Sequence, residues 1–217
     1  MCKFIVTTAF VVLLFSCRPY VKDTVSQPGR LDTVTENGAW GSLKVEFPVY
    51  NHAYTDSVIE ALVQQRISEF KKYTVDAPIS DNWTNELTIG YEEYFADKGI
   101  VSIVFKIYQF TGGAHGNSFI QTLTVDSEND KIIYLKDVIE QRNFKKLQQF
   151  VRNKLKEDLE FKDFIDDGTE RWSDFSSFAI SATGYTFWFS PYQVAPYVNG
   201  IQKVDVPKSL FKTKEQE

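Results

Sequence analysis

The residues best suited to chemistry in this sequence form a glycine-rich run around His115. The run reads Thr111, Gly112, Gly113, Ala114, His115, Gly116 and Asn117. Glycine adopts backbone conformations that other residues rarely reach, so this density of glycine indicates that backbone geometry matters here. Three interpretations stay open: a tight turn in which His115 only packs, a recognition loop that offers N–H groups and the imidazole to a ligand, or a general base or metal ligand.

A catalytic or metal-binding role for His115 requires partners that the sequence does not offer in any standard pattern. The only other histidine is His52, so the usual zinc ligand sets cannot be assembled. A site built from both histidines and a carboxylate such as Asp76 or Asp97 is conceivable, but nothing in the spacing brings these groups together. Phosphate-loop, dinucleotide-binding and nucleophile-elbow patterns are absent. We therefore predict no catalytic residue, no metal and no cofactor.

The first residues are typical of an export signal. Phe4 to Phe15 is an uncharged, mostly apolar stretch, too short to span a bilayer. It runs into Leu14-Phe15-Ser16-Cys17, which resembles the lipobox of bacterial lipoproteins. The resemblance implies cleavage after residue 16 and a lipid on Cys17 that tethers an extracytoplasmic protein to a membrane of the cell envelope. An ordinary secretory signal, or a free thiol in a cytosolic protein, is the alternative.

The composition indicates which partners are not expected and what must stabilise the fold. Removing residues 1–16 takes away one lysine, so 23 basic residues face 29 acidic ones and the net charge moves from −5 to −6. Nucleic acid is therefore not an expected partner. One cysteine remains, which permits no internal disulfide, and a large core must supply the stability. The 18 phenylalanines offer ample apolar area for it.

The elements that must position the glycine-rich run follow from hydrophobic periodicity. Residues 17–40 are polar, with scattered Pro and Gly, and predict a flexible lipid-anchored tether. Strands are expected at 43–50, 86–96, 100–110, 118–126, 132–135, 175–182, 185–190 and 201–206, and amphipathic helices at about 56–73 and 144–159. Pro48 favours an edge position for the first strand. Residues 100–108 are apolar on both faces, which favours a central strand covered on each side, one side by the first helix.

These elements predict an α+β fold with antiparallel sheets and two amphipathic helices, in the order β-α-β-β-β-β-α-β-β-β. We divide the chain into a signal peptide at 1–16, the tether at 17–40, an N-terminal α+β half at 41–126 and a C-terminal α+β half at 127–217. In this arrangement the glycine-rich run joins two neighbouring strands of the first half.

The run and its surroundings also resemble a known family. Tyr108-x-x-Thr-Gly-Gly-Ala-His-Gly116 is similar to the hallmark of an extracytoplasmic bacterial domain, found in RsiV-type lysozyme-sensing anti-sigma factors and in the non-catalytic region of PdaC-type peptidoglycan deacetylases. A second segment, Phe187-Trp-Phe-x-x-Tyr192-x-x-Ala-Pro-Tyr197-x-x-Gly200, is similar to the family's closing half. The resemblance covers roughly residues 43–211.

The resemblance implies a binding module, since the domain recognises lysozyme in the anti-sigma factors and accompanies the catalytic domain in the deacetylases. Ligand-binding candidates are the run from Thr111 to Asn117 together with Tyr192 and Tyr197, although the two tyrosines could also only fill the core. We predict an envelope-anchored, non-catalytic lipoprotein that binds lysozyme-like proteins or peptidoglycan-derived glycans. A peptidoglycan-directed hydrolase using His115 and a structural subunit of an envelope complex are the alternatives.

Overall fold

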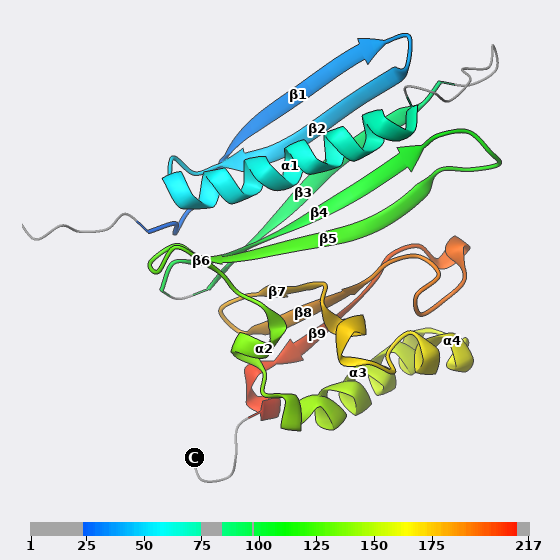
Figure 1. The fold of residues 1–217 in the computed structure, drawn as a ribbon. Coiled ribbons are helices and arrows are strands. Elements are labelled where there is room, and N and C mark those ends of the chain that lie inside the picture. Colours follow the sequence, from blue (N-terminus) through cyan, green and yellow to red (C-terminus); the bar gives the residue numbers. More distant parts are fainter. Residues whose placement is uncertain (1–23, 75–83, 97, 212–217) are drawn as a thin grey trace, which may run out of the picture.

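Two β-sheets packed face to face, each covered by helix on its outer side, form the fold (Figure 1). The computed structural model describes residues 24–74, 84–96 and 98–211. The first sheet has six strands in the order β1 (Arg30–Gly38), β2 (Gly41–Val49), β3 (Glu86–Ala96), β4 (Ile100–Phe110), β5 (Asn117–Asp126) and β6 (Lys131–Ile132). The second has three, β7 (Phe178–Ile180), β8 (Gly184–Phe189) and β9 (Gln202–Pro207). The helices are α1 (Ala53–Thr74), α2 (Leu135–Val138), α3 (Phe144–Asp158) and α4 (Lys162–Asp167).

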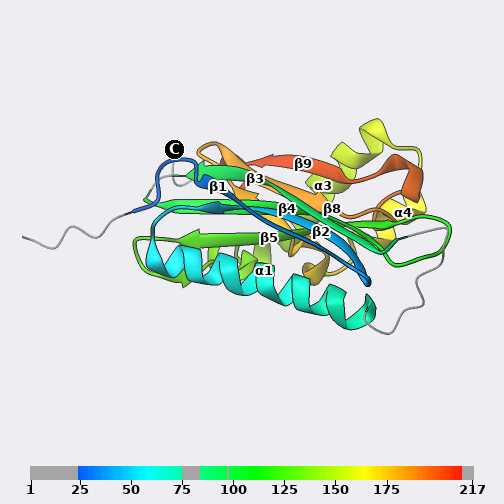
Figure 2. The same ribbon diagram turned by 90° about the horizontal axis from the view of Figure 1, so that it is seen from above.

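The predicted α+β class and the two amphipathic helices are confirmed. The meander β3-β4-β5 is antiparallel, as expected, while β2 pairs with β3 in parallel across the helix that joins them. Figure 2 shows α1 running along the length of the first sheet. The order agrees with the prediction except that β1 precedes the first expected strand and the short helices α2 and α4 flank α3.

The position of β4 between two packed layers explains why both of its faces are apolar. Val101, Ile103, Phe105 and Ile107 are buried in the core beneath α1, which contributes its own buried stripe. Val104, on the opposite face, belongs to a smaller cluster between the two sheets. Successive side chains of a strand point to opposite faces, so a strand inside two layers must be apolar on both.

The second core lies between α3 and the second sheet. Phe175 is fully buried, and its ring meets those of Phe144, Phe187 and Phe189 edge-on at centroid distances of 5.6 to 5.9 Å. Leu147, Val151 and Leu155 of α3 are buried beside them at the predicted helical spacing. Edge-to-face packing of this kind favours one defined arrangement of the core.

Hydroxyl side chains join the two sheets. The backbone N–H of Ile180 donates to the Ser102 hydroxyl at 2.9 Å, and the N–H of Phe178 donates to the Thr122 hydroxyl at 3.2 Å. The Ser102 and Thr124 hydroxyls, both buried, lie 2.8 Å apart. The first sheet therefore satisfies backbone donors of β7 that would otherwise be buried without partners.

The tether prediction is wrong over Arg30–Gly38, which forms β1 and pairs with β2 along its whole length. This strand has no buried residue, and its short polar side chains left no periodicity to detect. As a result β2 is an inner strand, contrary to the expectation from Pro48. Its parallel pairing with β3 ends at Val45, before the proline is reached.

The first described residues are fixed at one end of the first sheet. Val25 is buried, and its N–H donates to the Ser127 hydroxyl at 2.8 Å. Nearby, Glu93 accepts hydrogen bonds from the Gly29 N–H and, at 2.6 Å, from the Tyr50 hydroxyl. Burial raises the pKa of the Tyr50 hydroxyl, and the hydrogen bond to Glu93 raises it further. The predicted signal peptide and Cys17 lie outside the described residues, and among the helices described none is long and apolar enough to cross a membrane.

Candidate functional site

Two loops that are far apart in the sequence meet at one end of the sheets (Figure 1). The first is the glycine-rich run between β4 and β5, and the second joins β8 to β9. The Tyr197 hydroxyl donates a hydrogen bond of 2.7 Å to the Gly116 carbonyl, across 81 residues of sequence. Both segments that were singled out as ligand-binding candidates therefore belong to one surface.

Three stacked rings form the centre of this surface, which we call the aromatic cluster: His115, Tyr197 and Tyr192. The His115 and Tyr197 rings lie 4.6 Å apart at 27°, and the Tyr197 and Tyr192 rings lie 5.4 Å apart at 36°. Tyr192 is 57% exposed and His115 is also exposed, whereas Tyr197 between them is partly buried. The cluster thus presents ring surface to solvent and rests on Tyr197.

The orientation of His115 follows from a local contact. Its Nδ1 lies 2.9 Å from the carbonyl oxygen of Gly116. A carbonyl oxygen only accepts, so this contact requires the proton on Nδ1 and leaves Nε2 of the neutral ring as an acceptor. The His115 ring is therefore stacked on Tyr197 with Nδ1 bonded to the backbone and Nε2 as its remaining acceptor atom.

Backbone geometry explains the glycines of the run. Gly112 and Gly113 have φ values of 93° and 105°, a region that side chains rarely tolerate. Tyr192 also has positive φ, at 69°, which costs roughly 1 kcal/mol or more for a residue other than glycine. Thr111, Ala114 and Asn117 are exposed around these turns.

Gly116 serves close packing instead. A Cβ atom there would lie 2.4 Å from the Tyr108 ring. We expect Gly116→Ala to lower the free energy of unfolding by about 1–3 kcal/mol, because the ring or the loop must move. Urea denaturation measures the loss, and Gly90→Ala is the control since a Cβ at Gly90 has no atom within 4 Å. Equal stability of the two variants would contradict the packing described.

The second loop is held by Gln193, a residue without any signal in the sequence analysis. Its side-chain amide donates to the Gly168 carbonyl at 3.1 Å and to the Asp174 carbonyl at 2.9 Å. Ser190, at the start of the loop, accepts the N–H of Ile120 from β5 at 3.1 Å. These contacts fix the backbone on either side of Tyr192 relative to both sheets.

The conceivable two-histidine site is not formed. His115 lies at the Asn117 end of β5, whereas His52 Nε2 is 3.8 Å from Asp130 Oδ1, beyond the other end. A strand of 10 residues separates these ends by about 30 Å. Asp76 and Asp97 lie outside the described residues. Within the described ranges, no three His, Cys, Asp or Glu side chains gather closely enough to hold a metal ion.

Comparison with known families places both loops in matched regions. The family model for deacetylase PdaC matches residues 34–118, and the model for a protein of unknown function (DUF3298) matches residues 136–209. The first match contains the glycine-rich run, and the second contains Tyr192 and Tyr197. The aromatic cluster therefore lies where the two matched regions meet in space.

Individual relatives match most of the chain. The chain is 29% identical over 198 residues to the peptidoglycan-N-acetylmuramic acid deacetylase PdaC of Bacillus subtilis (strain 168), covering 87% of this chain and 42% of that protein. It thus spans about two fifths of that relative's length. Solved DUF3298 family structures share the fold: one from Bacteroides fragilis NCTC 9343 has a TM-score of 0.60 at 17% identity, covering 87% of this chain and 93% of that one. One from Pseudomonas aeruginosa PAO1 has a TM-score of 0.63 at 15% identity, covering 85% and 93%.

The resemblance to PdaC-type proteins that the sequence motif predicted is confirmed. The resemblance to lysozyme-sensing anti-sigma factors stays a prediction.

Proposed function

The two matched regions make this chain a relative of the PdaC and DUF3298 families, and from that premise we propose that it is a non-catalytic binding domain of the bacterial cell envelope. Its recognition surface is the aromatic cluster together with the run from Thr111 to Asn117, most of which is exposed. The Bacillus relative is a peptidoglycan deacetylase by name, which supports an extracytoplasmic location and a cell-wall ligand for this chain.

Glycan is the ligand class that the aromatic cluster supports best, and the stacked rings are the observation that carries this proposal. One face of a pyranose ring carries C–H groups, which pack favourably against the electron-rich face of an aromatic side chain. Tyr192 and His115 expose such ring surface, and His115 Nε2 adds a hydrogen-bond acceptor. A peptidoglycan fragment offers both features, because its sugar rings have C–H faces and carry polar groups that form hydrogen bonds.

A protein ligand is the second candidate, because apolar surface extends beyond the rings. Val198, next to Tyr197 in the sequence, is 89% exposed and belongs to the same loop as the exposed Tyr192. Tyrosine is one of the residues most enriched in protein-binding hot spots. A lysozyme-like protein is the partner to test, given the motif shared with lysozyme-sensing domains.

A lipid on Cys17 would orient this surface away from the membrane. Val25 is fixed near Ser127, at the end of β5 opposite the aromatic cluster. Six residues, 18–23, separate Cys17 from Thr24, the first described position. The anchored end would therefore lie near the bilayer, with the recognition surface about 30 Å farther out along β5.

The contacts of His115 support binding over catalysis. Among the described residues no carboxylate contacts His115, so its ring lacks the acidic partner that stabilises the imidazolium in a Ser-His-Asp triad. Incubation with insoluble peptidoglycan tests the proposal: the protein is expected to sediment with it and to release no soluble fragments. Release of fragments that His115→Ala abolishes would instead establish the hydrolase alternative. Stoichiometric co-purification with one protein and no ligand would favour the structural-subunit alternative.

A further inference from the structure

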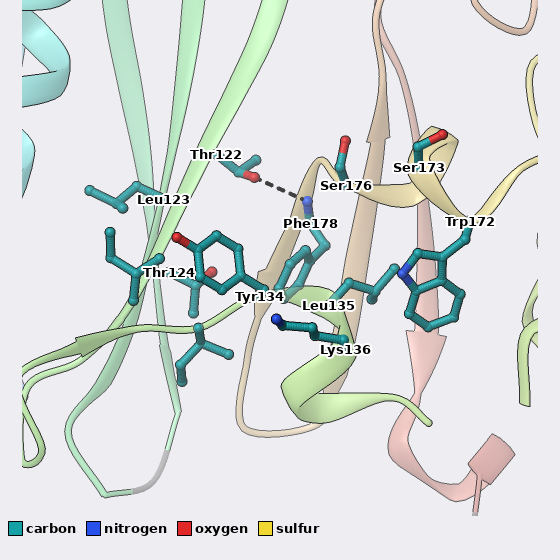
Figure 3. Close-up of a pocket in the computed structure, with 12 residues that line it drawn as sticks. Thr122, Leu123, Thr124, Tyr134, Leu135, Lys136, Trp172, Ser173, Ser176 and Phe178 are labelled. Carbon is teal, nitrogen blue, oxygen red and sulfur yellow. Dashed lines mark hydrogen bonds between the residues drawn. The ribbon is translucent and has the colours of Figure 1, made fainter. Parts of the chain in front are cut away.

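A pocket of about 320 Å³ lies between the two halves of the fold, away from the aromatic cluster. Its walls come from β5, β6 and α2 on one side, and from β7 and the short helix Trp172–Phe175 on the other (Figure 3). It shares no residue with the aromatic cluster, so a ligand here would be additional to the proposed function. The volume is at the lower end of small-molecule sites, which suits one side chain or one small ring.

The interior of the pocket is apolar. Three rings, those of Tyr134, Trp172 and Phe178, line it (Figure 3). Ile133 and Leu135 add aliphatic surface, whereas Leu123 of β5 turns its side chain into the core beneath α1. Trp172 is fixed by an edge-to-face contact with Phe144 at 5.6 Å, and Phe178 is buried. The walls formed by Trp172 and Phe178 are therefore held in place, and preformed walls bind an apolar group without having to reorganise.

One charge lines the pocket. Lys136 is the only ionisable cation among its lining side chains, and no carboxylate lines it. The Lys136 ammonium lies 5.7 Å from the centre of the Tyr134 ring, and in the described part of the chain it forms no ion pair with an acidic group. An anionic group on the ligand would therefore meet an unneutralised cation at the mouth.

The edge of β5 adds backbone groups beside the pocket. The Thr124 carbonyl accepts the N–H of Ile133, and the N–H of Ile120 donates to Ser190, so the even-numbered residues turn their backbone groups away from β4. Thr122 has the same phase and lines the pocket. No backbone hydrogen bond of Thr122 on this side appears among the described residues, which leaves its N–H and C=O available to an extended ligand.

We propose that this pocket binds an apolar group that carries a neighbouring carboxylate, with the apolar part between the three rings and the carboxylate at Lys136. A peptide's carboxyl-terminal apolar residue and a free arylalkanoic acid share this chemistry. The peptide would gain two further hydrogen bonds from the Thr122 edge, which the free acid cannot form.

Nuclear magnetic resonance titration of the soluble protein, residues 18–217, tests this site. The probes are N-acetyl-alanyl-phenylalanine, the same dipeptide as its amide, and 3-phenylpropionate. We expect saturable binding of the free acids with dissociation constants on the order of 1 mM, and shifts at the amides of Thr122, Tyr134 and Lys136. The amide should bind about threefold or more weakly, since it lacks the charge. A dipeptide that binds more tightly than phenylpropionate identifies a peptide source, and the reverse order a free acid.

Two variants and one control show whether the probes bind in this pocket. Lys136→Met should remove the difference between acid and amide, while Lys72→Met, the same change on an exposed residue of α1, should preserve it. Ser176→Phe places a ring into the pocket from an exposed position and should abolish binding of all probes with little loss of stability. Absence of saturable binding, equal affinity for acid and amide, or binding unchanged by Lys136→Met and Ser176→Phe would overturn the proposal. None of these results bears on the aromatic cluster.

Discussion

Tyr197→Ala is expected to weaken glycan binding at least about tenfold, because Tyr197 is the ring on which the other two rest. Its removal deletes the stacking partner of His115 at 4.6 Å and of Tyr192 at 5.4 Å. It also deletes the hydrogen bond to the Gly116 carbonyl that joins the two loops. Calorimetric titration of wild-type and variant protein with the same peptidoglycan fragment measures the change.

Two further variants separate the causes of this loss. Tyr197→Phe keeps the ring and removes only the hydroxyl, so it should retain most of the affinity if stacking dominates. Tyr73→Ala removes a tyrosine that is 70% exposed at the end of α1, and it should leave the affinity unchanged. An affinity of Tyr197→Ala equal to that of the wild type would show that the ligand binds elsewhere.

Gly168→Ala should be strongly destabilising, by about 3 kcal/mol or more. A Cβ atom at Gly168 would lie 1.7 Å from the carbonyl oxygen of Gln193, which is backbone and cannot rotate away. The loop that carries Tyr192 and Tyr197 would have to move outward, breaking the hydrogen bond from Gln193 to the Gly168 carbonyl. Urea denaturation measures the loss of stability, and the same protein should also bind glycan more weakly.

The comparison with Gln193→Ala makes this prediction specific. That variant removes the two side-chain hydrogen bonds to the Gly168 and Asp174 carbonyls, and a longer one that the Ser190 N–H donates to the Gln193 side-chain oxygen at 3.3 Å. It introduces no steric clash, so it should cost less, roughly 1–2 kcal/mol. If Gly168→Ala proved as stable as wild type, the close approach of the two backbones would be wrong, and with it the present account of how the second loop is positioned.

Much of the fold could be predicted from the sequence, because its clearest hydrophobic patterns lie within single helices and strands. The helical spacing of Leu147, Val151 and Leu155 predicted α3, and the two apolar faces of β4 predicted a strand between layers. Strand β1 gave no such signal, since its stability comes from pairing with β2 along its whole length and not from buried side chains of its own.

Only separate parts of the candidate site could be predicted from the sequence. The glycine-rich run and the segment with Tyr192 and Tyr197 stood out separately, but their contact depends on how two sheets stack, which no local pattern encodes. Gln193 and Gly168 were missed for the same reason, because each has meaning only through the other. The pocket at Lys136 is likewise assembled from segments between Thr122 and Phe178 that show no shared pattern.

The most direct test of the central claim is a nuclear magnetic resonance titration of residues 18–217 with soluble N-acetylglucosamine–N-acetylmuramic acid fragments, followed by a C-type lysozyme. We expect saturable glycan binding with a dissociation constant on the order of 100 µM, and shifts confined to residues 111–117 and 190–200. Lysozyme binding at the same residues would instead assign the surface to a protein partner. Shifts elsewhere in the molecule, or none with either ligand, would contradict the assignment of the aromatic cluster as a recognition surface.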